Sequence, residues 1–148
     1  MIDHVWTVLC SRAVIDQESN NISIQNAIEQ VTIVGEPKPD GFLPADMEVV
    51  TLWARADPNV PAEGRERLTF LSPSKENLLS DENIIDLTAA KRHRWRWKLN
   101  GLPVREAGGH VFQVELQCNS ESEWRVVASI PLEIVFKPPK MEQEPNEA

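Results

Sequence analysis

The sequence has no tyrosine, two cysteines and six glycines, and its 148 residues include fewer basic than acidic side chains. Two cysteines are too few for a disulfide-rich scaffold, and without a C-x-x-C motif they cannot build a four-ligand zinc site. The net charge of −8 argues against general nucleic-acid binding, which needs a cationic surface. With 41% hydrophobic residues, the chain is long enough for one globular domain with a buried core.

Targeting signals are also missing from the sequence. The first ten residues, MIDHVWTVLC, lack the basic start and the apolar stretch of a secretory signal. No window approaches the roughly 18 apolar residues of a membrane span. We therefore expect a cytoplasmic protein with no membrane partner. Cys10 and Cys118 lie in apolar runs and are interpreted as buried free thiols, with a disulfide between an early and a late strand as the alternative.

Short apolar runs alternate with turn-forming clusters, and no 3.6-residue period is sustained. Residues 16–21 form a polar, Asn-containing cluster that predicts a hairpin, and residues 72–82 are expected to form a loop with at most one helical turn. The predicted strands are 5–15, 22–34, 47–56, 65–71, 84–99, 111–118, 124–130 and 132–136. This pattern predicts a single antiparallel β-sandwich of about seven to nine strands. The domain should span 1–136, and 137–148 should be a disordered, acidic, proline-containing tail.

The alternation of apolar side chains predicts which positions face the core. These are Val8, Ile22, Ile24, Val31, Ile33, Trp53, Leu68, Phe70, Trp95, Trp97, Phe112, Val114, Leu116, Val126, Ile134 and Phe136.

The segment 91–98, KRHRWRWK, is the most informative part of the sequence. It holds five of the 15 basic residues, whereas the other 10 are set against 23 acidic ones. If the segment is a strand, one face carries four cations, spaced about 7 Å apart, and the other carries His93, Trp95, Trp97 and Leu99. The four cations are Arg92, Arg94, Arg96 and Lys98.

Two interpretations of this basic face stay open. In the first, the cations pair with acids on neighbouring strands, and Glu115 is a candidate partner. Positive charge that protects a sheet edge belongs to the same structural interpretation. In the second, the face binds an anion, a nucleic-acid strand or an acidic protein patch. Because Trp95 and Trp97 should point to the opposite face, one ligand cannot easily use both sets.

No catalytic or cofactor motif is found in the sequence. The histidines, His4, His93 and His110, lack metal-ligand spacing, and there is no nucleophile elbow, P-loop or dinucleotide fingerprint. Residues 16–20 begin like a calcium-binding loop, but Asn21 and Ala27 stand where that loop needs Gly and Glu. We therefore expect no enzyme activity, no catalytic residues, no metal and no cofactor.

Several segments resemble a known family. These are HVWTVLCSRAVID, ISIQNAIEQVTIV, GGHVFQVEL and IPLEIVF, which together extend over about residues 1–136. They are similar to uncharacterised small bacterial proteins with a single immunoglobulin-like or C2-like β-sandwich. His110 departs from that pattern, in which such strands often have Tyr. The resemblance implies a fold and no activity, cofactor or catalytic residue.

The leading functional hypothesis is a non-enzymatic protein-interaction or assembly module. Its partner is expected to be a protein, with homo-oligomerisation through a sheet edge as one form. The second hypothesis is an anion or nucleic-acid binder that uses Arg92, Arg94, Arg96 and Lys98, with nucleic acid the less favoured ligand. The third is a hydrolase or carbohydrate-active domain, which would need exposed tryptophans and a carboxylate in one cleft.

Overall fold

The computed structural model describes residues 1–140, which form nine strands and contain no helix. The predicted all-β class is therefore confirmed, and this part of the chain offers no helix long and apolar enough to cross a membrane. The strands are β1 (Ile2–Ile15), β2 (Ile22–Ala27), β3 (Gln30–Val34), β4 (Phe42–Arg55), β5 (Ala62–Leu71), β6 (Asn77–Leu87), β7 (Arg92–Pro103), β8 (Gly108–Cys118) and β9 (Arg125–Lys137). The expected domain end at residue 136 is one residue short of the end of β9, and most of the expected tail, 141–148, lies outside the described residues.

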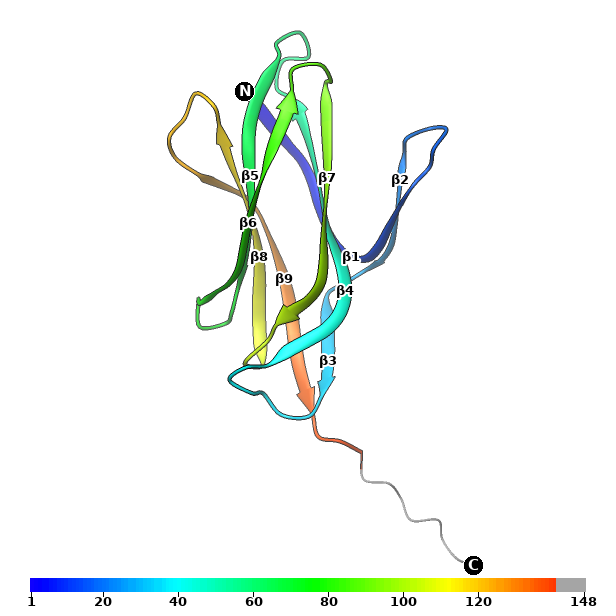
Figure 1. Cartoon of the computed structure of the whole chain (residues 1–148), viewed down its shortest axis with the longest axis vertical. Helices are drawn as coiled ribbons and strands as arrows, with labels where there is room; N and C mark the ends of the chain where they lie inside the picture. The colour runs from blue at the N-terminus through cyan, green and yellow to red at the C-terminus, as the bar shows by residue number, and fades with distance from the viewer. Residues whose placement is uncertain (141–148) are drawn as a thin grey trace, which may run out of the picture.

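The strands form two sheets, with the orders β2-β1-β4-β7 and β3-β9-β8-β5-β6 (Figure 1). The first sheet is antiparallel, but β3 runs parallel to β9, with Gln30 opposite Glu133. The expectation of a purely antiparallel domain is therefore wrong for the second sheet. The reason is a change of sheet after β2: the Ile28 N–H donates to the Leu9 carbonyl of β1, while the Glu29 carbonyl accepts the Glu133 N–H of β9.

One hydrophobic cluster contains buried side chains from both sheets. Trp53 and Trp97 come from the first sheet, and Phe70 and Phe112, whose ring centroids are 4.5 Å apart, come from the second. Many of the predicted inward positions are buried in this cluster or packed against it. They are Val31, Ile33, Trp53, Leu68, Phe70, Trp97, Phe112, Val114, Leu116, Ile134 and Phe136.

Two predicted core residues, Trp95 and Val126, are exposed instead. Trp95 shares a strand face with Trp97 and meets it edge to face, but β7 is an edge strand, and 39% of Trp95 is exposed. Val126 is 49% exposed because the pairing of β8 with β9 shifts register between Val114 and Glu115. A bulge reverses the alternation beyond it, so Val127 packs against the core instead.

Several strand boundaries differ from those predicted. Of the segment expected to be a loop, 72–82, residues 72–76 form a turn as expected, but residues 77–82 belong to β6, which pairs with β5. The expected strand 22–34 divides into β2 and β3, near Asn26, whose φ of 53° lies in the left-handed region. The expected strands 124–130 and 132–136 join into β9 through Pro131. Proline is tolerated there because β3 pairs only with Glu133–Lys137, which leaves β9 locally at an edge.

The hairpin predicted around residues 16–21 is confirmed, and it forms a separate structural unit. Residues 11–27, which we call the arm, comprise the second half of β1, the turn and β2, and they project from the two sheets (Figure 1). Beyond Cys10, β1 no longer pairs with β4. A second, smaller cluster joins the arm to the face of β4 that points away from the main core. Its buried members are Cys10, Ala13 and Val50, with Trp6, Val8, Ile22 and Ile24 packed against them.

Both cysteines are free and buried. Cys10 belongs to the arm cluster and Cys118 to the main cluster.

Candidate functional site

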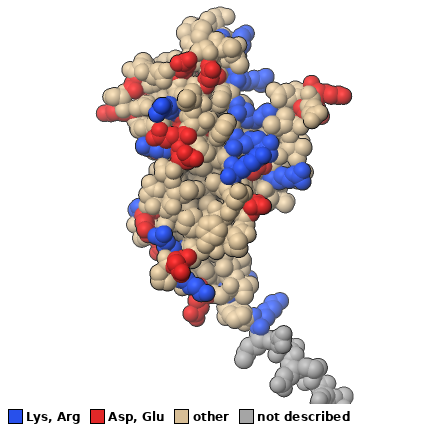
Figure 2. All heavy atoms as spheres, in the orientation of Figure 1, with Lys and Arg blue, Asp and Glu red and all other residues tan. Residues whose placement is uncertain are grey.

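A hollow of about 760 Å³ lies between the arm and β7. Lys and Arg atoms gather on the surface beside the arm, as Figure 2 shows. The hollow is lined by four basic residues, three polar residues of the arm turn and several apolar residues, with no acidic residue in its described lining. These residues are Trp6, Ile15, Ser19, Asn20, Asn21, Ile22, Leu52, Arg92, Arg94, Trp95, Arg96 and Lys98.

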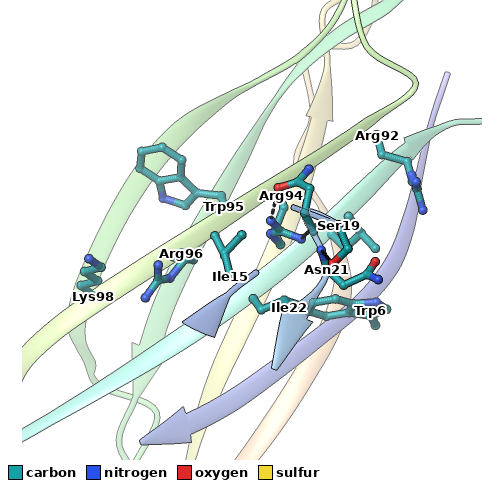
Figure 3. A pocket seen from close by; sticks show the side chains of 12 residues that line it. Trp6, Ile15, Ser19, Asn21, Ile22, Arg92, Arg94, Trp95, Arg96 and Lys98 are labelled. Carbon is teal, nitrogen blue, oxygen red and sulfur yellow. Dashed lines mark hydrogen bonds between the residues drawn. The ribbon is translucent and has the colours of Figure 1, made fainter. Parts of the chain in front are cut away.

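All four cations singled out in the sequence line this hollow. Arg92, Arg94, Arg96 and Lys98, which we call the basic row, alternate along β7 and point to the same side of the sheet. The Trp95 indole points away from them, as Figure 3 shows, and Trp97 is buried in the core. The alternation therefore separates the charged and aromatic side chains of this strand as the sequence predicts.

Arg96 is the most strongly bound member of the basic row. Its guanidinium lies 2.7 Å from the Glu48 carboxylate of β4, and it also donates to the Ala13 carbonyl at 2.9 Å. The second oxygen of Glu48 accepts the Ala13 N–H. Ala13 lies where β1 has left β4, so its backbone groups on that side have no strand to pair with. The ion pair of Arg96 and Glu48 satisfies them and fixes the base of the arm.

Arg94 contacts the tip of the arm through hydrogen bonds to uncharged oxygen atoms. Its two terminal nitrogens donate to the backbone carbonyl and the side-chain oxygen of Asn20, each at 3.1 Å. Asn20 has φ of 58°, a conformation that Asn tolerates in tight turns. The turn is ordered by Asp16, whose carboxylate accepts the N–H groups of Glu18 and Ser19. These bonds lower the pKa of Asp16.

Arg92 and Lys98 lie at the two ends of the basic row and are exposed. Among residues 1–140, neither side chain has a hydrogen bond or ion pair. Arg96 is thus the one member of the row that forms an ion pair with a described carboxylate, whereas Arg92, Arg94 and Lys98 form none among residues 1–140.

The prediction that Glu115 pairs with the basic row is wrong. Glu115 lies on β8 in the second sheet, where it accepts two hydrogen bonds from Arg67, at 2.6 and 3.0 Å. Arg67 also covers the Trp124 ring at 4.4 Å. The true acidic partner, Glu48, was missed because its position among apolar residues of β4 gave no sign of a charge pair.

Glu66 is a second buried acid that the sequence analysis missed. It is fully buried between the sheets, where it accepts hydrogen bonds from the Thr51 hydroxyl at 2.7 Å and from the indole N–H groups of Trp53 and Trp97, each at 2.9 Å. Burial raises the pKa of Glu66, and the hydrogen bonds from Thr51, Trp97 and Trp53 oppose that rise. A signal existed, because Glu66 has the same strand parity as Leu68, which was assigned inward.

The remaining chemical groups do not converge on a site. Within residues 1–140, no group of three His, Cys, Asp or Glu side chains could hold a metal ion. Burial lowers the pKa of His4 and of His93. Trp53 and Trp97 are buried, and Trp124 belongs to the other sheet from Trp95. Trp6 and Trp95 are both in the lining of the hollow, but its described lining contains no carboxylate.

Comparisons with known proteins add little to this description. No protein-family model matches the sequence, and no curated protein matches it. Among solved structures, the N-terminal domain of PorA is similar to this chain at 11% identity, with a TM-score of 0.33, over 89% of this chain and 98% of that one. A likeness this distant transfers no function, and the site has to be judged by its own chemistry.

Proposed function

We propose that this chain is a non-enzymatic protein-interaction module that binds an acidic segment of a partner protein in the hollow between the arm and β7. The observation that carries the proposal is the basic row, which lines the hollow with four cations and keeps three of them without an acidic partner among the described residues. Cations, amides and apolar side chains suit a binding surface. The described lining has no carboxylate, histidine or cysteine for acid–base or nucleophilic chemistry.

We also propose that the two sheets pack face to face as an immunoglobulin-like or C2-like β-sandwich. It is supported by the hydrophobic cluster that both sheets share and by the hydrogen bonds from Trp53 and Trp97 to Glu66 across them. Cytoplasmic location and self-association through a sheet edge stay predictions. The second copy in such an oligomer would be one source of the acidic segment.

An acidic protein segment fits the charge distribution better than a nucleic-acid strand. The basic row spans about 20 Å, since alternate residues of a strand repeat at about 7 Å. A longer polyanion would extend beyond it over a chain whose net charge is −8. Nucleic-acid strands also gain affinity when successive bases stack on several aromatic side chains, but Trp95 and Trp97 point away from the basic row, which leaves Trp6 as the aromatic side chain of the lining on the arm side.

Fluorescence anisotropy with a labelled oligo-glutamate peptide of about seven residues tests the proposal, since an extended peptide of that length spans the row of about 20 Å. We expect binding that weakens as salt is raised and falls by about tenfold in the double variant Arg92→Glu/Lys98→Glu. The matched control is Lys38→Glu/Arg125→Glu, which changes the net charge equally at exposed residues outside the hollow lining.

Three results would overturn the proposal. One is the absence of binding at low salt. Another is an equal loss in both double variants, which would reflect net charge alone. The third is tighter binding of an oligo-thymidine strand of similar length than of the peptide, which would favour the nucleic-acid alternative.

A further inference from the structure

The hollow offers different chemistry on its two sides. The β7 side carries the basic row, and the arm side carries Ile15 and Ile22, with Trp6 beside them, as Figure 3 shows. Leu52 of β4 adds a further apolar surface. A ligand that lies between the two sides therefore meets cations in one direction and apolar groups in the other.

The spacing of the available cations fits an extended ligand. Arg92 and Arg94 are two residues apart on one strand, so their side chains are separated by about 7 Å, which is also the repeat of alternate side chains in an extended peptide. Two acidic residues with one residue between them would therefore match this pair. The next position is closed to a ligand because Arg96 already pairs with Glu48.

Arg94 is the exchangeable contact in this arrangement. Its present partners are the neutral oxygens of Asn20. A carboxylate binds a guanidinium more strongly than a neutral oxygen does, because it adds the attraction of opposite charges and can accept two parallel hydrogen bonds. An incoming acidic side chain can therefore replace Asn20 on Arg94, and this exchange opens the contact between the arm tip and β7.

We infer that the hollow recognises an acidic–apolar–acidic sequence in extended conformation. The two carboxylates bind Arg92 and Arg94, and the apolar side chain between them points the other way, onto Ile15 and Ile22 of the arm. Burial of that side chain favours binding in proportion to the apolar area that it removes from water. This inference rests on the proposed function and specifies the kind of segment that is bound.

Three labelled peptides with the same Gly/Ser flanks test the inference by anisotropy. Their central residues are Glu-Leu-Glu, Glu-Glu-Leu and Glu-Ser-Glu, so the second changes only the order and the third only the apolar group. We expect Glu-Leu-Glu to bind at least about fivefold more tightly than either of the others. Arg94→Gln should abolish this preference.

The variant Asn20→Gly provides a result that a merely structural role would not give. Glycine accepts the φ of 58° at this position, and the substitution removes the side-chain oxygen that competes for Arg94. We expect Asn20→Gly to bind Glu-Leu-Glu about twofold to fivefold more tightly than the unmodified chain does. Unchanged or weaker binding would overturn the exchange at Arg94.

The outcomes separate the two proposals. If all three peptides bind equally well, the recognition of a sequence fails while the acidic-segment function stands. If none of the three peptides and no oligo-glutamate binds, the proposed function itself fails.

Discussion

Glu66 and Glu48 are two buried glutamates in two different parts of the molecule, and their surroundings contrast. Glu66 lies in the main core, and its hydrogen-bond partners are neutral donors of the other sheet, Thr51, Trp53 and Trp97. Glu48 lies under the arm, where it meets the charge of Arg96 and the N–H of Ala13. Glu66 therefore joins the two sheets, whereas Glu48 joins β4 and β7 to the arm within one sheet, and only Glu48 has a counter-charge.

The contrast separates an acid enclosed in the main core from an acid that lies beside the hollow. Glu66 is enclosed by the main cluster, so its removal should affect the whole domain. Glu48 is almost buried, but its partner Arg96 keeps 26% of its side chain exposed and lines the hollow. Changes at Glu48 should therefore act on the arm before they act on the two sheets. Three measurements test this division.

The largest effect is expected for Glu66→Ala. The substitution leaves a cavity and deprives two indole N–H groups and one hydroxyl of their acceptor, so we expect a loss of about 3 to 5 kcal/mol in the free energy of unfolding. Denaturant titration followed by tryptophan fluorescence measures it. Glu63→Ala, on the same strand but exposed, is the matched control and should cost under about 1 kcal/mol. Similar losses in both variants would contradict the role given to Glu66.

Glu48→Ala should have a smaller effect that is confined to the arm. It leaves Arg96 and the Ala13 N–H without their acceptor, and since Arg96 is partly exposed we expect a cost of about 1 to 3 kcal/mol. Amide hydrogen exchange should accelerate in residues 11–27 and stay unchanged in β5 and β8. Glu82→Ala is the control, because it removes an exposed ion pair with Arg65. Faster exchange throughout both sheets would mean that the arm is not a separate unit.

The pH dependence of stability gives the smallest and most specific effect. Because burial raises the pKa of Glu66, the folded chain binds this proton at a higher pH than the unfolded chain, whose Glu pKa is about 4.3. Above the unfolded value, the contribution of Glu66 to stability therefore falls as the pH rises toward the folded value.

The variant Glu66→Gln lacks this titration while the other acids remain. The difference in unfolding free energy between the unmodified chain and Glu66→Gln should therefore grow in favour of the unmodified chain as the pH is lowered from about 7 to about 5. Denaturant titrations at several pH values measure this difference. A difference that does not vary with pH would show that Glu66 does not titrate differently in the two states.

Side-chain periodicity accounts for what could be predicted from the sequence. It predicted an all-β chain and placed Arg92, Arg94, Arg96 and Lys98 on one face of one strand, since alternation is a local property. It predicted the hairpin of the arm but not the contacts of the arm with β4 and β7, because these join distant parts of the chain. The ion pair of Arg96 with Glu48 joins residues 48 positions apart, and the Arg94 contact with Asn20 joins residues 74 positions apart.

Bulges and edges explain why the core prediction failed at particular residues. One extra residue in β9 reversed the direction of Val126, and the place of β7 at an edge left Trp95 exposed. Neither the bulge nor the edge position of a strand can be predicted from the local sequence. The position of Glu66 could have been predicted, because it alternates in step with the inward-facing Leu68 on the same strand. It was not predicted because acidic residues are rarely buried.

The parallel pairing of β3 with β9 has a consequence for synthesis on the ribosome. β3 is made early, but its neighbour in the sheet is the last strand, with Val31 opposite Ile134. The arm hairpin can close as soon as residue 27 has emerged, whereas β3 has no partner until β9 has left the exit tunnel. An edge strand that stays unpaired while the residues between β3 and β9 are made is a target for chaperones and a risk for aggregation.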